Sequence, residues 1–434
     1  MLKACLYTLG CRVNQYESDA IAFELQKSGV AIVPPTENAD ICIINTCSVT
    51  SESDRKSGQI IRRLIKKNPS AAVVVTGCFS QIKPQSALDI EGVDLVCGNN
   101  GKSTIAQKAI SLAKEKKKVK ELYMPDLYSG HFDTMYAGAP MTRTRAFIKI
   151  QDGCDSKCAY CIIPQARGSV RSSDPKDVLA EANDIAKEGV LEIVFTGIET
   201  ASYGKDFKNR YSLGDLLTEA DKIEGLKRIR LGSLDPSQIT QELVEKIKPL
   251  GKIMNHFHIS MQSGCTKTLN EMKRKYNIDM AKESLERLRQ AFPNVQFSAD
   301  VITGFPNETD EDFEKTLEFF KEQKFLHLHI FPYSKREGTV AAGMKNQVPE
   351  NIKRERLHRL EAVQGEIKAS ILAEFIERTK SVPVLFESYD GEFASGHTPE
   401  FIEVKVKSDC SLANRILNVK PLSAGDGIVV AELA

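Results

Sequence analysis

Short apolar runs alternate with longer amphipathic stretches through the first 120 residues. In the stretch that contains Ile60, Ile61, Leu64 and Ile65, the apolar positions recur at the spacing of one helix face. Strands that alternate with helices predict a parallel sheet with both faces covered. The predicted strands are 3–9, 40–46, 72–76 and 94–97, and one helix is predicted over 18–28.

A second alternating series starts near Phe147 and contains six predicted strands with helical stretches between them. Six strand–helix units favour an open, partial (β/α)6 barrel. A long amphipathic helix is predicted over 349–380, and the short strands after Val382 predict a small β-barrel. The barrel strands are expected at 147–151, 192–196, 228–232, 256–261, 296–302 and 327–331, and the C-terminal ones at 382–388, 401–407, 418–421 and 427–433.

These patterns divide the 434 residues into four parts of an α/β protein. A single hydrophobic core stops growing at roughly 250–300 residues, so several domains are expected. The predicted parts are an N-terminal parallel-sheet domain (1–120), a linker rich in Pro, Gly, Tyr and Asp (121–142), the partial barrel with its C-terminal helix (143–380) and the small β-barrel (381–434).

Composition narrows the class of protein. Lysine and arginine number 59 against 58 aspartate and glutamate, so the net charge of +1 argues neither for nor against a nucleic-acid partner. We expect no membrane span, because no run of about 18 apolar residues occurs. The first residues lack the regions of a signal peptide, which favours a cytoplasmic location. In a reducing compartment, the eleven cysteines are better suited to metals or catalysis than to disulfides.

Three cysteines, which we name the compact triad, stand close together after the first strand of the second series. Cys154, Cys158 and Cys161 form a C-x3-C-x2-C pattern, and loops at the carboxyl ends of strands carry the chemistry in (β/α) folds. Three thiolates on one loop can hold three irons of a cubane cluster and leave the fourth iron open. Structural zinc is the alternative, but it is closed by four ligands and no partner pair lies nearby. The spacing favours an iron–sulfur cluster.

Three further cysteines, the dispersed triad, lie far apart in the chain. Cys11, Cys47 and Cys78 each follow the end of a predicted strand. Ligands bind beyond the carboxyl ends of parallel strands, so these thiols can meet at one point. One such cysteine is better read as a buried small residue, but three in the same position favour a second three-thiolate cluster. Cys97 also ends a strand and stays open as a fourth ligand.

Several motifs together resemble the radical SAM methylthiotransferase family. The segment 153–168 is similar to that family's cluster loop, and the segments around the dispersed triad are similar to its three N-terminal cluster motifs. The segments 258–264, 300–306 and 331–336 resemble its later barrel strands. The C-terminal strands resemble its TRAM module, a small RNA-binding β-barrel. The resemblance covers almost the whole chain.

This resemblance implies a transferase with two [4Fe-4S] clusters that uses two molecules of S-adenosylmethionine (SAM) per turnover. The compact triad would hold the cluster that cleaves SAM to a 5′-deoxyadenosyl radical, and the dispersed triad would hold the cluster that donates sulfur. An electron donor such as flavodoxin or ferredoxin is implied. We expect a monomer.

Three substrates compete within the family: isopentenyladenosine in tRNA, an aspartate of a ribosomal protein, and N6-threonylcarbamoyladenosine (t6A) beside the anticodon. The segments 10–18 and 196–204 are most similar to the third branch. The resemblance thus implies conversion of t6A at position 37, in the anticodon loop of ANN-decoding tRNAs, into 2-methylthio-t6A. The other two substrates remain alternatives, as does a non-catalytic RNA-binding protein with structural metal.

Candidate SAM-binding residues follow the strands of the predicted barrel. Tyr160 lies between two cysteines of the compact triad, where its ring could lie against the adenine or pack under the cluster. Gly197 and Glu199 follow the second strand, and Glu199 could accept a hydrogen bond from the methionine ammonium group. Ser233 and Gln262 follow the third and fourth strands and are weaker candidates.

The C-terminal module is acidic for an RNA-binding part. From Val382 onward it has four basic and eight acidic residues, whereas phosphate contacts normally use Lys and Arg. Either the module contacts RNA through one basic edge, or the central barrel supplies basic patches. Three candidate patches are Arg143 with Arg145, Arg167 with Arg171, and the run 273–275.

Overall fold

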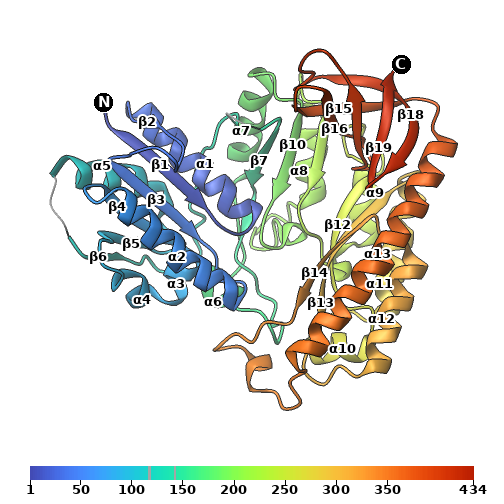
Figure 1. Ribbon diagram of the computed structural model, residues 1–434, viewed down its shortest axis with the longest axis horizontal. Coiled ribbons are helices and arrows are strands. Elements are labelled where there is room, and N and C mark those ends of the chain that lie inside the picture. The colour runs from blue at the N-terminus through green and yellow to red at the C-terminus, as the bar shows by residue number, and fades with distance from the viewer. Residues whose placement is uncertain (116–118, 141–142) are drawn as a thin grey trace.

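The computed structural model describes residues 1–115, 119–140 and 143–434. Its N-terminal domain is built on a six-stranded parallel sheet in the order β2-β1-β3-β4-β5-β6 (Figure 1). Every residue of β3 and β4 is buried, as expected for a sheet covered on both faces. The strands are β1 (Lys3–Thr8), β2 (Ala31–Ile32), β3 (Ile41–Thr46), β4 (Ala72–Gly77), β5 (Leu95–Cys97) and β6 (Glu121–Tyr123).

Helices cover both faces of this sheet through separate hydrophobic clusters. Ile21 and Leu25 of α1 pack with α5 on one face, and Ile61 and Leu64 of α2 pack on the other. The helix predicted over 18–28 begins earlier, at Arg12, directly behind Cys11. The helices are α1 (Arg12–Lys27), α2 (Ser51–Lys67), α3 (Cys78–Ile82), α4 (Pro84–Leu88) and α5 (Ile105–Glu115).

The central part confirms the predicted partial barrel. Strands β11-β10-β7 form one parallel sheet and β12-β13-β14 another, and the bridges Ile229–Ile253 and Leu234–Ile259 join them. The six strands therefore run in chain order and are backed by helices. The strands are β7 (Arg145–Lys149), β10 (Glu192–Thr196), β11 (Arg228–Leu231), β12 (His256–Gln262), β13 (Gln296–Thr303) and β14 (His327–Pro332), with β8 (Gln151–Asp152) and β9 (Arg171–Ser172) as a small pair.

The helices around the barrel are α6 (Ile163–Arg167), α7 (Pro175–Lys187), α8 (Leu213–Ala220), α9 (Gln241–Ile247), α10 (Thr266–Glu271), α11 (Ile278–Ala291), α12 (Asp310–Gln323) and the long α13 (Glu350–Arg378). Helix α13 runs along the barrel toward the C-terminal module (Figure 1). Its buried positions, including Leu360 and Phe375, belong to the same hydrophobic cluster as the barrel core.

The C-terminal module is a closed five-stranded barrel in the order β15-β16-β17-β19-β18, which confirms the predicted small β-barrel. Strand β16 was not predicted, because Ser395 and Gly396 interrupt its apolar pattern. Strand β15 contacts the central barrel: Arg228 donates hydrogen bonds to the carbonyls of Pro383 and His397. The strands are β15 (Val382–Tyr389), β16 (Phe393–His397), β17 (Glu403–Lys407), β18 (Ile416–Gly425) and β19 (Ile428–Leu433).

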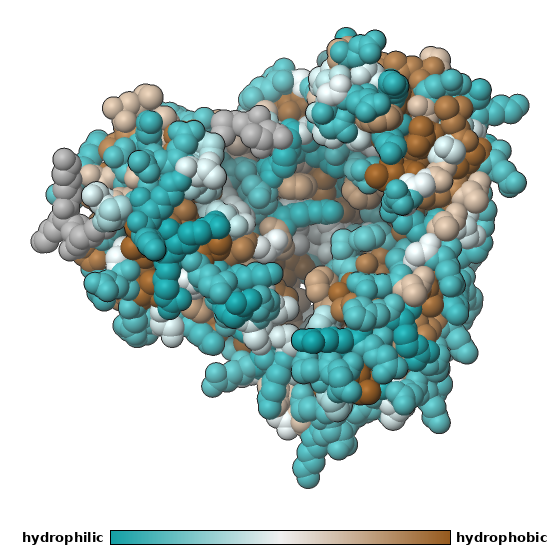
Figure 2. Space-filling view, in the orientation of Figure 1, coloured by the Kyte–Doolittle hydropathy of each residue, from teal (hydrophilic) through white to brown (hydrophobic). Residues whose placement is uncertain are grey.

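The N-terminal sheet extends into the segment predicted as a linker. Strand β6 pairs in parallel with β5 and lies inside 121–142; residues 141–142, at the end of that segment, lie outside the described residues. Figure 2 shows the surface hollowed between the N-terminal domain and the central barrel. Among the described helices, none has the length and apolar character needed to cross a membrane.

Candidate active site with two cysteine triads

The compact triad lies on a loop that the backbone holds at several points. Gly153 adopts a φ of +73°, and a side chain there would meet the carbonyl of Ser169. Cys154 N donates to Gly168 O at 3.0 Å, and Ala159 N donates to Met272 O at 2.9 Å. The loop is therefore fixed before any ligand binds, with all three cysteines as free thiols.

Polar groups surround the sulfur atoms of this loop. Backbone N–H groups of Ser156 and Ile163 point at the sulfurs of Cys154 and Cys161, each at 3.4 Å. Burial, reinforced by neighbouring cysteines, raises the pKa of Cys161 to about 12. A free thiolate is thus disfavoured here, whereas a coordinated metal deprotonates its thiol ligands outright.

Arg274 lies in the site, although the sequence pattern predicted a surface contact with RNA at this position. Its guanidinium donates to Cys158 Sγ at 3.3 Å, Tyr160 OH at 3.3 Å and Asp235 Oδ2 at 2.6 Å. The basic run 273–275 suggested an RNA contact, but the Arg274 side chain is only 7% exposed. It binds the cysteine loop instead, and Asp235 neutralises it.

Glu199 lies beside this loop, at the wall of a cavity of about 140 Å³ that Asp155, Ser156 and Asp235 also line. Its backbone N–H donates to Gln151 Oε1 at 2.9 Å, and its Oε1 accepts from Asp235 N at 3.2 Å. Burial and the charge of Asp235 raise the pKa of Glu199 to about 7. The carboxyl can therefore accept a cation or release a proton near neutrality.

The remaining candidate residues sit at the same end of the barrel. A side chain at Gly197 would lie 2.7 Å from Gln151 Oε1, so glycine is needed for the close approach. Gln262 ends β12 with a φ of +61°, next to an irregularity in the pairing with β13. Ser233 follows β11, beside the bridge between Leu234 and Ile259. For Ser233 and Gln262 a role in SAM binding stays a prediction.

The dispersed triad occupies the carboxyl ends of three neighbouring strands. Cys11 follows β1, Cys47 follows β3 and Cys78 follows β4, and these strands are adjacent in the sheet. A side chain at Gly10, whose φ is +99°, would lie 2.9 Å from Cys47 Cβ. The strand-end argument thus placed these cysteines correctly, although their role as ligands stays a prediction.

Cys97 does not join this group. It is fully buried and packs in the hydrophobic cluster with Ile105 and Ala106, on the α5 side of the sheet. Burial raises its pKa to about 12. This packing favours a core role for Cys97 over that of a fourth ligand.

The spacing of the sulfur atoms separates a cluster from a single ion. Two thiolates on one tetrahedral zinc ion lie about 3.8 Å apart, given a Zn–S distance of about 2.3 Å. Within the described residues, only His258, Asp300 and His329 bring three ligand atoms within 4.8 Å of one another, so neither cysteine triad is that tight. A cubane carries its thiolates on separate iron atoms, so it does not need three sulfur atoms as close together as a single zinc ion does.

A buried ionic network connects the two triads. Glu17 of α1 forms ion pairs with three cations. Arg167 donates to its Oε1 at 2.5 Å, Lys149 lies 3.1 Å from the same oxygen, and Lys102 is the third. Arg167 also donates to Asp152 Oδ2 at 3.1 Å. Burial alone would raise the pKa of Glu17, but the three cations hold it well below its usual range.

This network supplies positive charge next to the sulfur atoms. Three cations face two carboxylates, and Arg167 interacts electrostatically with Cys11 and Cys78. Such an excess suits thiolate-bound clusters, which are anionic. Arg167 and Arg171 are both buried, so the prediction of an RNA patch at these two residues is wrong. No local pattern indicated the pairing of Arg167 with Glu17, because the two residues lie 150 positions apart in the chain.

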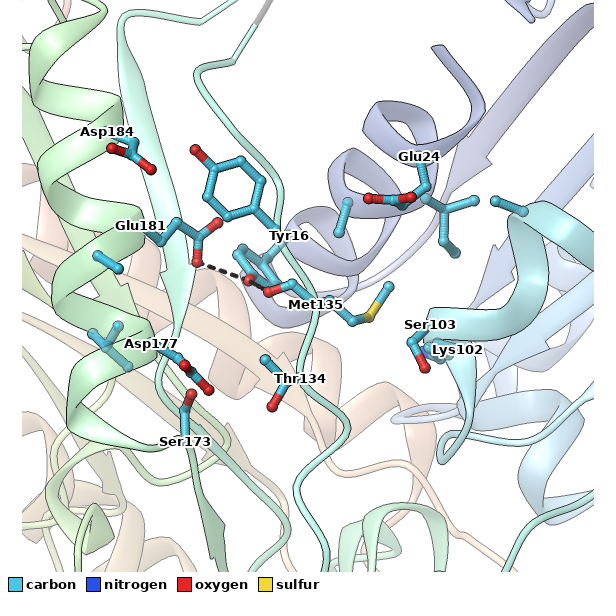
Figure 3. Close-up of a pocket in the computed structure, with 16 residues that line it drawn as sticks. Tyr16, Glu24, Lys102, Ser103, Thr134, Met135, Ser173, Asp177, Glu181 and Asp184 are labelled. Carbon is cyan, nitrogen blue, oxygen red and sulfur yellow. Dashed lines mark hydrogen bonds between the residues drawn. The ribbon is translucent and has the colours of Figure 1, made fainter. Parts of the chain in front are cut away.

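Two further contacts join the N-terminal domain to the central barrel. Asn99 Nδ2 lies 3.6 Å from Cys78 Sγ and donates to Ala166 O, in α6, at 2.8 Å. Figure 3 shows Tyr16 of α1 and Glu181 of α7 pointing toward each other in a cavity of about 460 Å³. Their oxygens are 3.0 Å apart. Helix α1, which begins behind Cys11, is therefore fixed to the barrel at both ends of this interface.

Comparison with known proteins agrees with this geometry. Residues 148–320 match the Radical SAM superfamily, and residues 3–98 match the Uncharacterized protein family UPF0004. The chain is 39% identical over 429 residues to the threonylcarbamoyladenosine tRNA methylthiotransferase MtaB of Bacillus subtilis (strain 168), covering 98% of this chain and 95% of the relative. The chain belongs to the radical SAM methylthiotransferase family. SAM and iron–sulfur clusters are the cofactors of this family, as predicted.

Other members of the radical SAM methylthiotransferase family match over similar lengths. The MtaB of Aquifex aeolicus (strain VF5) is 38% identical, over 87% of this chain and 91% of the relative. The tRNA-2-methylthio-N(6)-dimethylallyladenosine synthase of Bacillus subtilis (strain 168) is 32% identical, over 99% and 86%. The radical SAM methyltransferase TsrM of Kitasatospora setae shares the fold, with a TM-score of 0.55 and 15% identity over 76% of this chain and 73% of that one.

Proposed function

We propose that this enzyme converts t6A at position 37 of ANN-decoding tRNAs into 2-methylthio-t6A. The observation that carries the proposal is the pair of cysteine triads in a chain that is 39% identical to one tRNA methylthiotransferase of this type. The dimethylallyl-type relative from the same organism is 32% identical. The t6A substrate is therefore favoured over the isopentenyl type.

The cysteines hold the groups that supply the hard chemistry: when bound, a cluster on the compact triad gives the electron that cleaves SAM to a radical, and one on the dispersed triad gives the sulfur. The residues of the chain bind and orient. Glu199 accepts the methionine ammonium group of SAM in its ionised form. Tyr160, fixed by Arg274 through its hydroxyl, presents its ring to the adenine.

The partners follow from this function. The anticodon loop enters from the hollow between the N-terminal domain and the barrel, where the two triads face each other. An electron donor such as flavodoxin or ferredoxin reduces the compact-triad cluster, and the enzyme works in the cytoplasm as a monomer. The acidic C-terminal barrel contacts RNA through its basic strand residues, among them Lys405 and Lys407.

Mass spectrometry of tRNA nucleosides from a deletion strain tests the proposal. We expect 2-methylthio-t6A to disappear and t6A to accumulate, with restoration by the plasmid-borne chain. Persistence of 2-methylthio-t6A would contradict the proposal. Loss of 2-methylthio-isopentenyladenosine, or an unmodified ribosomal-protein aspartate, would identify one of the alternative substrates instead. About four irons or fewer in the reconstituted protein, or zinc, would favour a non-catalytic role.

A further inference from the structure

A cavity of about 300 Å³ lies inside the barrel, between the start of α1 and strands β7, β10, β11, β12 and β15. The inward positions of neighbouring strands meet in register, as Phe147, Val194 and Arg230 do. Their sequence neighbours Ile148 and Ile193 point outward into the helix-covered core. The cavity is therefore formed by the barrel interior and capped by Arg12 of the N-terminal domain.

Four arginines line this cavity, and three of them are neutralised by carboxylates. Arg145 pairs with Glu192 and Glu387, and Arg230 pairs with Glu192 at 3.0 Å. Arg143 pairs with Asp19 of α1. These three cations are structural, because each already has an anionic partner.

Arg12 is the exception. It is exposed to the cavity, and in the part of the chain that the structure describes no hydrogen bond or ion pair holds its guanidinium. Its contact with the Phe147 ring, 5.9 Å from the centroid, is weak. Among the described residues its positive charge has no paired carboxylate, and it lines a cavity that an anionic group can enter.

Asp300, the acid near Arg12, is not its counterion. Asp300 influences Arg12 electrostatically but forms no ion pair with it, and its Oδ2 lies 3.2 Å from His258 Nε2. The other ring nitrogen of His258 lies 2.9 Å from Ser298 Oγ. His258 and Asp300 are therefore already hydrogen-bonded, and the cation Arg12 beside them disfavours a metal ion there.

Arg12 lies next to a cysteine of the dispersed triad. It directly follows Cys11, so the same turn presents a cysteine of the dispersed triad and the guanidinium. The threonylcarbamoyl group of t6A ends in a carboxylate, whereas a dimethylallyl group is a hydrocarbon. We propose that Arg12 binds the threonyl carboxylate of t6A and makes the enzyme selective for this base over adenosines with apolar N6 substituents. This inference rests on the proposed function and names the group that recognises its substrate.

Three anticodon stem-loop RNAs test it: one with t6A, one in which the t6A carboxylate is converted to its methylamide, and one with dimethylallyladenosine. Initial methylthiolation rates are measured with the reconstituted enzyme, and RNA binding to the protein is measured in parallel by fluorescence anisotropy. We expect the wild type to prefer the carboxylate over the methylamide by about 10- to 100-fold, the range of a charge-assisted hydrogen bond. The variant Arg12→Gln should lose this preference, and Arg12→Lys should keep part of it.

The matched control is Arg143→Gln, a cation of the same cavity that Asp19 already neutralises, and this variant should keep the wild-type preference. Iron content is measured for every variant, because Arg12 adjoins Cys11, and the anisotropy readout does not need a working cluster. A wild type that discriminates poorly between carboxylate and methylamide, or an Arg12→Gln variant that keeps the preference, would overturn the inference while the proposed function stands. A wild type inactive on the t6A RNA would overturn both.

Discussion

The two cysteine triads differ in what holds them. The compact triad lies within eight residues of one loop, whose backbone hydrogen bonds fix it locally. The dispersed triad exists only when β1, β3 and β4 pair in register, since its members lie at least 31 residues apart. A cluster on the dispersed triad should therefore be coupled to the folding of the whole N-terminal sheet, whereas a cluster on the compact triad is coupled mainly to one loop.

The largest expected effects come from removing one cysteine from either triad, because each variant should lose one cluster and one of the two roles. Cys158→Ala and Cys47→Ala should each lower iron from about eight to about four per protein. The first should abolish formation of 5′-deoxyadenosine, and the second should keep it but yield no methylthio product. Iron and sulfide assays with product chromatography measure both. Continued SAM cleavage by Cys158→Ala would show that the two roles are assigned wrongly.

Arg167 tests how the triads are held together. The variant Arg167→Met leaves Glu17 buried beside two lysines and removes the link to Asp152. Leaving a buried charge without any partner costs about 3–5 kcal/mol. Because Glu17 keeps both lysines, the free energy of unfolding in urea should fall by less than that.

The double variant Arg167→Met with Glu17→Gln is the matched control. It takes the carboxylate partner away from buried Lys102, so it should lose more stability than the single variant. Equal stability of the two variants would mean that the charges of this network contribute little and that Arg167 acts through packing.

The sequence predicted the long central strands and the grouping of both triads, because β-branched runs and strand-end cysteines are local signals, but it missed β16 and the short strands β2, β6, β8 and β9. It missed the start of α1, since Asn14 and Glu17 of the first turns are buried polar residues that disguise the helical pattern. It also missed the partners of Arg167 and Arg274. Buried ion pairs depend on contacts between residues far apart in the chain, and in the sequence their members look like solvated surface charges. The domain boundaries remain predictions.

A pH titration examines the second contact of α1 with the barrel. Burial raises the pKa of Glu181 to about 7, while its carboxyl accepts from Ala137 N at 2.8 Å. The unfolded chain releases this proton near pH 4.5, so the folded state binds more protons between pH 4.5 and 7 and loses stability as pH rises. The loss is at most about 3 kcal/mol.

Urea unfolding at pH 5 and pH 8 measures this loss. Glu181→Gln should show a smaller difference between the two values than the wild type. Glu188→Gln, an exposed acid at the end of the same helix, should keep the wild-type difference. An unchanged pH dependence in Glu181→Gln would assign the titration to other groups.

The smallest expected effect comes from a methyl group beside the dispersed triad. Gly10 and Gly29 both have positive φ, but a side chain at Gly10 would lie 2.9 Å from Cys47 Cβ and 3.0 Å from its Sγ, while nothing lies within 4 Å at Gly29. Each alanine variant should cost about 1–2 kcal/mol of backbone strain. Only Gly10→Ala should also lower iron content, because it displaces a cysteine. Equal iron in the two variants would show that the dispersed triad tolerates shifts of its members, as a locally fixed loop would not.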